Sequence, residues 1–422
     1  MKILVLNAGS SSHKISLFEF AGNLPDDPPG HVWEARIEWH GETADTVVRS
    51  SSGPPRRAQS RVSSRVEAVE GLVATLWSGD SPVVTSPADI SVVGHRIVHG
   101  GEQYEEPVRI TPALKSGIAS VSAFAPLHNR AELEGIEAME KLFGDIPQVA
   151  VFDTGFHRKI PPAAATYPGP YEWLSAGIRR YGFHGINHQY CAGRAAQLLK
   201  RDLNSLKLVT CHLGNGCSLA AIQEGRSIDT TMGFTPLEGL MMGTRSGSVD
   251  PGILTYLLRQ GHLQPNDIDD VLNQRSGLLG ISGLSEDMRQ VLAAMRQGHS
   301  RARLAFDMYV HRLQAGIGAM AAVLGGIDAL VFTAGVGENS PEVRDATCSK
   351  LSFLGIELDT VANLRTAPDA DIAKADSSVR VLLIRAQEEW AIARECWMIA
   401  REPLSECPDI PRLQPTLSSR TR

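Results

Sequence analysis

The sequence KILVLNAGSSSHKISLFEF (residues 2–20) contains two apolar segments on either side of a short turn. Residues 2–6 and 14–20 are rich in the apolar and β-branched side chains that favour strands, and the Gly-Ser sequence at residues 9–12 is typical of a turn. These residues therefore predict a β-hairpin at the N-terminus and not the start of a helix.

Further short apolar segments follow along the chain. The predicted strands are apolar or β-branched and end at a polar or glycine-containing turn: residues 90–97, 149–152, 208–212 and 329–333. A helix is predicted at residues 62–77, and residues 25–30 and 50–60 before it are polar and rich in proline, as connections are. Strands that alternate with helices indicate an α/β chain.

Length and charge limit the possible classes of protein. With 422 residues the chain exceeds the size at which a single hydrophobic core stops growing, so two domains are expected. The net charge of −6 argues against a nucleic-acid binder, because affinity for a phosphate backbone needs concentrated Lys and Arg. The densest basic run is expected to be a solvated loop or helix face: Arg56, Arg57, Arg61 and Arg65.

The six cysteines are scattered without a CxxC pair, which fits a reducing cytoplasm. The N-terminal apolar run, residues 3–6, is too short for a signal peptide, so no export is expected. Residues 315–337 are apolar enough to suggest a membrane span, but Asp328 and many Gly and Ala residues argue against one. A buried helix to Leu324, a Gly-Gly turn and the strand at residues 329–333 explain this stretch better.

A glycine-rich stretch in the second half of the chain, DTTMGFTPLEGLMMGTRSGSVDP (residues 229–251), surrounds one arginine. Gly239, Gly243 and Gly247 allow positive φ angles and a close approach of the backbone. Arg245 offers a planar fork of five donors that suits carboxylate or phosphate oxygens. The stretch therefore indicates an anion site, with a surface loop and a solvated arginine as the alternative.

Nine more motifs accompany this stretch: NAGSSSHK (7–14), GHRIVHGG (94–101), APLHN (125–129), FDTGFH (152–157), RRYGFHG (179–185), HLGNGCS (212–218), SGLLGISG (276–283), DMR (287–289) and FTAGVGENS (332–340). Together they closely resemble the acetate kinase family of acyl-phosphate-forming kinases, nearly from end to end. Neither GxxxxGK[ST] nor GxGxxG occurs in the sequence, so the P-loop and the dinucleotide fingerprint do not apply.

The resemblance implies the two-lobed, duplicated, ribonuclease-H-like α/β fold of the actin and sugar-kinase superfamily, with a nucleotide cleft between the lobes. It implies that residues 1–153 and about 387–400 form an N-terminal lobe and that residues 154–386 form a C-terminal lobe with the nucleotide site. Family members are homodimers through the second lobe, so a homodimer is expected. Residues 401–422, with several Pro and Ser, are expected to be a disordered tail.

Making an acyl phosphate brings a carboxylate against a triphosphate, which costs on the order of 4 kcal/mol per charge pair at about 4 Å even with a dielectric constant near 20. In the family, arginines matching Arg96 and Arg245 meet the acyl substrate and the transferring phosphoryl group, and a histidine matching His184 steadies its equatorial oxygens. The alternatives are a strand arginine in a salt bridge for Arg96 and a satisfied core histidine for His184.

Asp153 matches an aspartate in the family's active centre that is sometimes described as a base. A carboxylic acid substrate has a pKa of about 4 to 5, like a Glu side chain, so it is already ionised at pH 7 and has no proton to give up. We predict instead that Asp153 orients metal-bound water or an arginine.

The resemblance also implies Mg²⁺, with Mn²⁺ as the alternative, and Asn7 and Glu388 match the family's metal-proximal pair. Mg²⁺ prefers oxygen ligands and keeps several waters. Residues 385–389 read Arg-Ala-Gln-Glu-Glu where Pro-Thr-Asn-Glu-Glu is usual in the family, which is a departure close to the metal. The alternative for Glu388 is a solvated first turn of a helix.

Two histidine pairs are spaced four residues apart, His95 with His99 and His184 with His188, as zinc ligands on a helix can be. Their β-branched and glycine-rich surroundings argue against a helix, and no HExxH glutamate accompanies either pair. A zinc site is therefore not expected.

For ATP and ADP, the resemblance points to one lysine and three segments: Lys14; His212, Leu213, Gly214, Asn215 and Gly216; Asp287, Met288 and Arg289; and Gly335, Val336, Gly337, Glu338 and Asn339. Backbone N–H groups beside these glycines can form anion-binding concavities.

An apolar wall around the methyl group of acetate is implied at four positions: Val98, Leu127, Phe183 and Pro236. Because one methylene is worth only about 0.8 kcal/mol of burial, such a pocket sets a preference of typically about 10- to 200-fold. The expected function is a cytoplasmic, Mg²⁺-dependent acetate kinase that converts ATP and acetate reversibly to ADP and acetyl phosphate. The alternatives are a propionate or other short-chain acyl kinase and a non-catalytic nucleotide-binding member of the superfamily.

Overall fold

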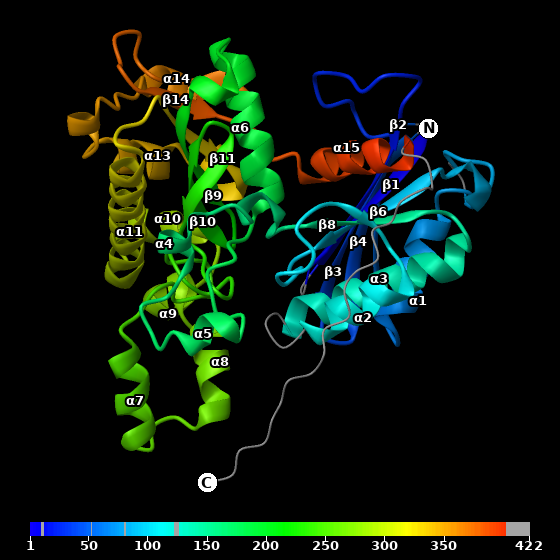
Figure 1. Cartoon of the computed structure of the whole chain (residues 1–422), viewed down its shortest axis with the longest axis horizontal. Helices are drawn as coiled ribbons and strands as arrows, with labels where there is room; N and C mark the ends of the chain where they lie inside the picture. Colours follow the sequence, from blue (N-terminus) through cyan, green and yellow to red (C-terminus); the bar gives the residue numbers. More distant parts are fainter. Residues whose placement is uncertain (10–11, 52, 80–81, 122–125, 402–422) are drawn as a thin grey trace.

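The computed structural model describes residues 1–9, 12–51, 53–79, 82–121 and 126–401, with the backbone alone at residues 126–128 and 266. Two β-sheets divide the chain, and helices pack against both (Figure 1). The tail expected at residues 401–422 lies outside the described residues, apart from Arg401 at the end of helix α15.

The first sheet has the strand order β5-β4-β3-β2-β1-β6-β8-β7. Its strands are β1 (Lys2–Ala8), β2 (Ser12–Glu19), β3 (Trp33–His40), β4 (Thr43–Ser50), β5 (Gly53–Arg61), β6 (Val92–Ile97), β7 (Val108–Arg109) and β8 (Gln148–Phe152). The predicted hairpin is confirmed, because β1 and β2 pair antiparallel with Leu4 opposite Leu17. The predicted strands at residues 90–97 and 149–152 are β6 and β8; β6 runs parallel to β1, and β8 runs parallel to β6.

The second sheet has the order β11-β10-β9-β12-β14-β13. Its strands are β9 (Lys207–Leu213), β10 (Cys217–Gln223), β11 (Arg226–Thr230), β12 (Ala329–Thr333), β13 (Ala370–Asp371) and β14 (Arg380–Leu383), so the predictions at residues 208–212 and 329–333 are confirmed. The plan β11-β10-β9-β12-β14 repeats β3-β2-β1-β6-β8: three antiparallel strands, then two strands parallel to the third. The duplication is therefore present in the topology.

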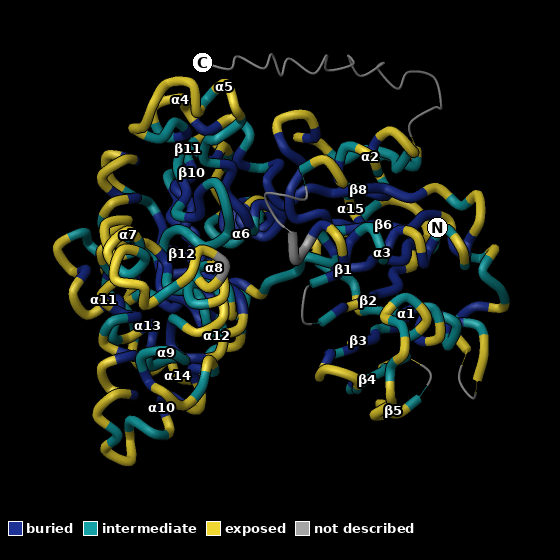
Figure 2. Tube along the Cα trace, turned by 90° about the horizontal axis from the view of Figure 1, so that it is seen from below, coloured by how far each residue is buried: buried dark blue, intermediate teal, exposed yellow. Residues whose placement is uncertain are grey.

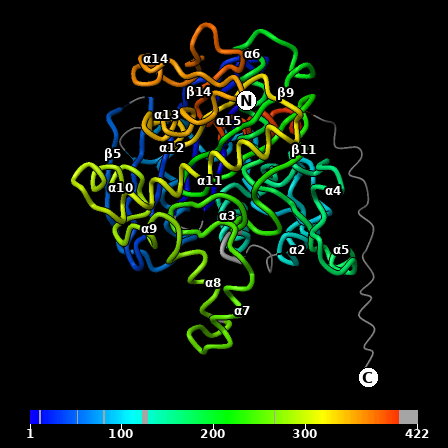
Figure 3. Tube along the Cα trace, turned by 90° about the vertical axis from the view of Figure 1, so that its left-hand side faces the viewer, coloured from blue at the N-terminus to red at the C-terminus, as the bar shows by residue number. Residues whose placement is uncertain are grey.

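The helices are α1 (Arg65–Ala74), α2 (Pro112–Ser120), α3 (Pro126–Phe143), α4 (Pro162–Ala165), α5 (Glu172–Ser175), α6 (Gly185–Leu199), α7 (Pro251–Arg259), α8 (Pro265–Gln274), α9 (Gly277–Ser282), α10 (Met288–Arg296), α11 (Ser300–Leu324), α12 (Ala334–Asn339), α13 (Pro341–Cys348), α14 (Thr360–Arg365) and α15 (Glu388–Arg401). Short 3₁₀ helices lie at Pro87–Asp89, Gly155–His157, Leu203–Ser205 and Ser352–Leu354. Helices α7 and α8 project from the body of the molecule (Figure 3).

Successive side chains of β1 point to opposite faces of the first sheet, and both faces are buried. Leu4 and Leu6 pack in a core with α1 and α3, whereas Ile3 and Val5 pack in a second core with α15 and α6. This second core continues to the second sheet, for example at Leu208, so α6 and α15 lie between the two sheets. A third core joins the other face of the second sheet to α11, and the inner strands of the molecule are dark blue, that is buried, in Figure 2.

Residues 53–61 form a strand, β5, where the sequence predicted a polar connection and a solvated loop or helix face. The residues after Gly53 are exposed, so Arg56, Arg57 and Arg61 lie on an exposed edge strand that pairs antiparallel with β4. The prediction was wrong because backbone pairing with β4 forms this strand, and the polar side chains carry no signal of that pairing. Charge on an edge strand hinders pairing with other chains.

Two helix predictions are confirmed with shifted or extended ends. Helix α1 begins at Arg65, because the Ser64 side chain accepts a hydrogen bond from the backbone of Glu67 and caps the helix. Helix α11 ends where Gly325 takes a φ of 63°, and the Gly-Gly turn leads into β12 as predicted. Within the described part of the chain, every helix is too short or too polar to cross a membrane.

Candidate active site

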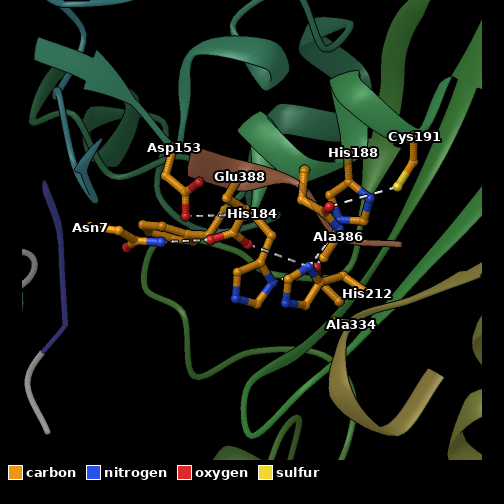
Figure 4. Close-up of polar contacts among 12 residues, drawn as sticks. Asn7, Asp153, His184, His188, Cys191, His212, Ala334, Ala386 and Glu388 are labelled. Atoms are coloured by element: carbon orange, nitrogen blue, oxygen red, sulfur yellow. Dashed lines mark hydrogen bonds and ion pairs between the residues drawn. The ribbon is translucent and has the colours of Figure 1, made fainter. Parts of the chain in front are cut away.

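The parallel strands of both sheets end in one region of the molecule. Asn7 lies near the end of β1, Arg96 lies near the end of β6, and Asp153 directly follows β8. In the second sheet His212 pairs with Thr333, so β9 and β12 end side by side. The carboxyl ends of parallel strands commonly form a crevice for ligands. Figure 4 shows polar side chains from both halves of the chain meeting there.

Asp153 is buried and forms an ion pair with Arg96, whose side chain is 13% exposed. Arg96 Nη2 lies 2.6 Å from Asp153 Oδ2, and the backbone N–H of His184 donates to the same oxygen at 3.0 Å. Burial alone would lower the pKa of Arg96, but the nearby carboxylates of Asp153 and Glu388 outweigh it and raise that pKa. Asp153 Oδ1 is buried and has no hydrogen-bond partner among the residues that the structure describes, so it offers an acceptor to a further donor.

The two positions assigned to the metal, Asn7 and Glu388, are in contact. Asn7 Nδ2 donates to Glu388 Oε2 at 3.1 Å and to Glu389 Oε1 at 3.0 Å, and Lys14 Nζ lies 3.9 Å from Glu389 Oε1. Burial raises the pKa of Glu388, and the negative charge of Asp153 acts in the same direction. Glu388 therefore lies at the start of α15 in a group of side chains, Asn7, Lys14, Glu388 and Glu389, in which two carboxylates face one lysine.

This group fits a divalent cation. The amide oxygen of Asn7 and the carboxylate of Glu388 are hard oxygen donors, which Mg²⁺ and Mn²⁺ prefer. Across the described ranges, no set of three or more His, Cys, Asp and Glu side chains could hold a metal ion by itself. A cation that keeps several waters and also binds substrate phosphates needs few protein ligands. The unpartnered Asp153 Oδ1 could accept from a metal-bound water.

His184 and His212 stack with ring centroids 3.9 Å apart and 13° between their planes. His184 Nδ1 lies 2.9 Å from Ser218 Oγ, and Asn187 Nδ2 donates to His212 Nδ1 at 2.8 Å. Burial lowers the pKa of His184 well below its usual value and lowers that of His212 to about 4, so both rings are neutral at pH 7. Glu388 Oε1 lies 4.0 Å from His212 Nδ1, but a neutral ring that accepts from Asn187 forms no ion pair.

One premise of the zinc argument was wrong. His184 is the residue before helix α6 and His188 lies in its first turn, so this pair lies at the start of a helix. Both rings contact the hydroxyl of Ser218, at 2.9 Å from His184 Nδ1 and 2.8 Å from His188 Nε2. His95 lies on β6, where its Nε2 contacts Gln148 Oε1 at 2.6 Å.

The glycines of residues 229–251 shape a close-packed loop. Gly239 and Gly247 have φ angles of 108° and 70°, which disfavour other residues, as predicted. Gly243 does not have a positive φ angle, and it is required for close approach only, since a β-carbon there would lie 1.9 Å from Asn215 Oδ1. The loop therefore packs directly against the turn that follows β9.

Arg245 is held in this loop without a carboxylate partner among the described residues. Its Nη1 donates to the carbonyl of Pro236 at 3.2 Å. Burial lowers the pKa of Arg245, although a guanidinium stays charged at neutral pH. A β-carbon on Gly216 would lie 3.3 Å from both Arg245 Nη1 and His184 Cε1, so Arg245 and His184 lie side by side.

Gly185 allows Asp153 and His184 to approach each other. Its N–H donates to the carbonyl oxygen of Asp153 at 2.8 Å, and a β-carbon on Gly185 would lie 2.3 Å from that oxygen. Gly185→Ala is therefore expected to destabilise the protein by about 1–3 kcal/mol and to lower activity more than about tenfold. Thermal unfolding and kcat measure both effects. Gly193→Ala in the same helix is the control, since its β-carbon would meet nothing within 4 Å; equal behaviour of the two variants would contradict the prediction.

The segments assigned to the nucleotide lie next to one another. The turn after β9 and helix α12 leave paired parallel strands. The N–H of Gly243 donates to the carbonyl of Asn215 at 3.0 Å, and Glu286, which precedes the segment Asp287–Arg289, lies beside Gly243. Lys14 comes from the first sheet, where it pairs with Asn7. The side chain of Lys14 reaches Glu389 at the start of α15, 3.9 Å away, on the edge of the region where both sheets end.

Several assigned polar side chains are bound within the protein itself. Arg289 forms an ion pair with Asp287, whose side chain also caps helix α10. The carboxylate of Glu338 accepts from the backbone N–H groups of Ala334 at 3.0 Å and Ala386 at 2.8 Å. Glu338 therefore ties α12 to the segment that leads into α15. The other residues of the assigned segment 335–339 also lie on α12: Gly335, Val336, Gly337 and Asn339.

Two of the four positions assigned to the acetate pocket belong to one hydrophobic core, whereas Pro236 is half-buried outside it and its carbonyl accepts from Arg245. Val98 and Phe183, assigned to the acetate pocket, are 3% and 1% exposed, and Leu213 and Met288 are buried in the same core. Leu213 and Met288 can thus face a ligand through their backbones alone. The side chain of Leu127 lies outside the described residues.

Sequence reasoning missed Glu132. This residue of α3 is 1% exposed, and both of its carboxylate oxygens accept from the N–H of Val98 at 3.1 Å. Burial raises the pKa of Glu132 to about 8, although Arg96 opposes the shift. Nothing in the local pattern of α3 could reveal this contact, because Glu132 meets Val98 across 34 residues.

Ser218, Asn187 and Glu389 were also missed as site residues. Ser218 contacts His184, Asn187 contacts His212, and Glu389 contacts Asn7. Each lies inside or next to a sequence feature described above: Ser218 ends HLGNGCS, Asn187 follows RRYGFHG by two residues, and Glu389 is the second residue of the Glu-Glu pair. Their position beside these motifs was the available signal.

Comparisons with known proteins agree on one family. The profile of the acetokinase family matches residues 2–394. The chain is 57% identical to an acetate kinase of Cyanothece sp. over 401 residues, which cover 94% of this chain and 98% of that protein. It is also 57% identical to an acetate kinase of Gloeobacter violaceus over 404 residues, 95% of this chain and 100% of that protein.

Solved structures give the same result. The crystal structure of Porphyromonas gingivalis acetate kinase matches with a TM-score of 0.86 at 39% identity, over 95% of this chain and 100% of that one. A propionate kinase from Francisella tularensis also matches with a TM-score of 0.86, at 36% identity, over 94% of this chain and 99% of that one. The chain belongs to the acetokinase family.

Proposed function

We propose that the protein transfers the γ-phosphoryl group of ATP directly and reversibly to acetate, giving acetyl phosphate and ADP. Family membership supports this reaction. The observation that carries the proposal is Arg245, a half-buried guanidinium beside His184 with no carboxylate partner within the described ranges. A cation held out of water without a counter-ion is costly, so its position calls for an anionic ligand. A transferring phosphoryl group is such a ligand.

In the proposed reaction an oxygen of acetate attacks the γ-phosphorus, and the bond from that phosphorus to the β–γ bridging oxygen breaks. Arg96 binds and orients the carboxylate of acetate, since its guanidinium is partly exposed and is held in place by Asp153. Arg245 and His184 donate to the equatorial oxygens of the group in transfer. These residues offset the repulsion between carboxylate and phosphate and stabilise the transition state electrostatically.

Asp153 is proposed to hold Arg96 and the backbone of His184, and not to act as a base. Acetate is ionised at neutral pH, so no proton has to be removed. We propose Mg²⁺ as the cation, held by Asn7 and Glu388, whose oxygens fit it. When bound, it would supply counter-charge to the phosphates of the nucleotide.

The nucleotide is proposed to bind through backbone N–H groups of the turn after β9 and of α12, with Lys14 reaching the phosphates from the first sheet. The adjacency of these segments supports this proposal. The further residues in this role are His212, Leu213, Gly214, Asn215, Gly216, Asp287, Met288, Arg289, Gly335, Val336, Gly337, Glu338 and Asn339.

Acetate is proposed as the preferred acid, with a pocket formed by Val98, Leu127, Phe183 and Pro236. Hydroxylamine traps acyl phosphates as hydroxamates, so the purified protein can be tested with ATP, Mg²⁺ and acids of two to four carbons. We expect kcat/KM for acetate to exceed that for propionate by about 10- to 200-fold. A higher kcat/KM for propionate would instead favour a propionate kinase, as one structural relative is named. Absence of hydroxamate with every acid would contradict the proposed reaction.

We also propose a homodimer formed through the second lobe. Ile253 and Tyr256 of the projecting helix α7 are 49% and 58% exposed, which suits a contact surface.

The lobes are proposed as residues 1–153 with α15 and residues 154–386, supported by the division of the strands between two sheets. A cytoplasmic location is proposed on the free thiols of the described cysteines.

A further inference from the structure

A chain of hydrogen bonds leads from strand β9 to His184. Thr210 Oγ1 lies 2.7 Å from His188 Nδ1, His188 Nε2 lies 2.8 Å from Ser218 Oγ, and Ser218 Oγ lies 2.9 Å from His184 Nδ1. Thr210, His188 and Ser218 have no exposed surface, so water cannot replace any of these contacts. The chain ends on the ring that the proposed function places against the phosphoryl group.

The number of protons allows this chain two states. Ser218 has one hydroxyl proton, and among the described residues its hydroxyl contacts only the two histidine rings, so the buried proton is satisfied only if Ser218 donates to one ring and accepts from the other. If Ser218 donates to His184 Nδ1, neutral His184 carries its proton on Nε2, and His188 donates to Ser218 and accepts from Thr210. In the reverse state His184 carries its proton on Nδ1 and presents a lone pair at Nε2. Each state fixes the tautomers of both rings together.

The donation from Ser218 to Nδ1 decides whether His184 carries a proton on Nε2, and this nitrogen faces Arg245. A β-carbon on Gly216 would lie 3.4 Å from His184 Nε2 and 3.3 Å from Arg245 Nη1, so Nε2 lies on the side of Arg245. The stacked ring of His212 has the corresponding arrangement, because the amide nitrogen of Asn187 can only donate to its Nδ1. A neutral His184 needs a proton on Nε2 to donate to an anion, since a lone pair there would repel a phosphoryl oxygen.

We propose that Ser218 is a positioning residue whose hydroxyl donates to His184 Nδ1 and thereby holds His184 in the tautomer with the proton on Nε2. This inference rests on the proposed phosphoryl transfer for its purpose. The geometry of the hydrogen-bond chain stands without it. Serine acts here through His184, as the aspartate of a catalytic triad acts through its histidine.

The tautomer can be measured in the unaltered protein. Enzyme labelled with ¹⁵N-histidine gives two-bond ¹H–¹⁵N correlations that distinguish the two tautomers, and loss of a signal set in a His184→Gln variant assigns His184. We expect the pattern with the proton on Nε2. A pattern with the proton on Nδ1 overturns the inference. Because this measurement involves no turnover, its outcome is separate from success or failure of the proposed reaction.

The kinetic test replaces Ser218. Ser218→Ala is expected to lower kcat about 10- to 100-fold, with KM for acetate and ATP little changed, and to give a mixture of His184 tautomers in the spectrum. Ser218→Thr keeps the hydroxyl and is expected to recover most of kcat and the single tautomer. Wild-type kcat in a folded Ser218→Ala enzyme, or a single unchanged tautomer, overturns the inference.

Ser227 provides a matched control for lost packing. It is 1% exposed on β11, and its Oγ lies 2.7 Å from Nδ1 of His157, a ring whose Nε2 donates to the carbonyl of Phe183 at 3.1 Å. Ser227→Ala therefore removes the same group from the same type of contact without touching His184. Its kcat is expected to stay close to wild type. A loss in Ser227→Ala equal to that in Ser218→Ala would assign the effect to general packing and overturn the inference.

Discussion

Replacing Arg245 with alanine is expected to lower kcat by at least about 1,000-fold while the affinity for ADP changes little. The guanidinium lies beside His184, where the phosphoryl group is proposed to pass, and no carboxylate among the described residues neutralises it. Its charge therefore acts mainly on the group in transfer. A coupled assay gives kcat, and titration calorimetry gives the affinity for ADP.

Two further variants define the role of Arg245. Arg245→Lys keeps the charge but loses the planar fork of donors, so an intermediate kcat is expected. Arg303→Ala is the control, because Arg303 is exposed on α11 and lies 4.0 Å from Asp307, with an expected kcat close to wild type. Turnover like wild type in Arg245→Ala would remove Arg245 from the proposed mechanism.

Asp153→Asn is expected to lower kcat/KM for acetate by about 100-fold or more, because a misplaced Arg96 no longer holds the carboxylate in line. Asparagine can still accept from the backbone N–H of His184, but it removes the charge that partners Arg96. Breaking a buried ion pair typically costs about 3–5 kcal/mol, so the free energy of unfolding should fall as well. Steady-state kinetics and chemical unfolding measure the two effects.

The pH dependence of the Asp153→Asn enzyme distinguishes orientation from base catalysis. The pKa of Arg96 is raised in the folded protein, so stabilisation by its charge is fully present below the unfolded value of about 12.5 and is lost only at higher pH. Acetate is also ionised from pH 6 to 9, so the activity deficit should be constant over that range. A deficit that disappears as pH rises would support a base and contradict the proposed role.

Local patterns in the sequence predicted much of the fold. The β1–β2 hairpin, the buried strands β6, β8, β9 and β12, and the end of α11 at its Gly-Gly turn all follow from side-chain burial and backbone freedom within a few residues. Strand β5 could not be found in this way, because pairing with β4 forms it and its exposed side chains carry no such pattern.

The sequence by itself determined the family, the identity of the motifs and those strands and helices whose own side chains show a buried pattern, because these depend on neighbouring residues. Only the tertiary structure decided which side chains meet. Asn7 contacts Glu388 across 381 positions, Glu132 binds the backbone of Val98, and one hydroxyl at Ser218 joins two histidines. Such contacts arise where the ends of distant parallel strands converge, and their geometry is set by strand order and register, which no short stretch of sequence encodes.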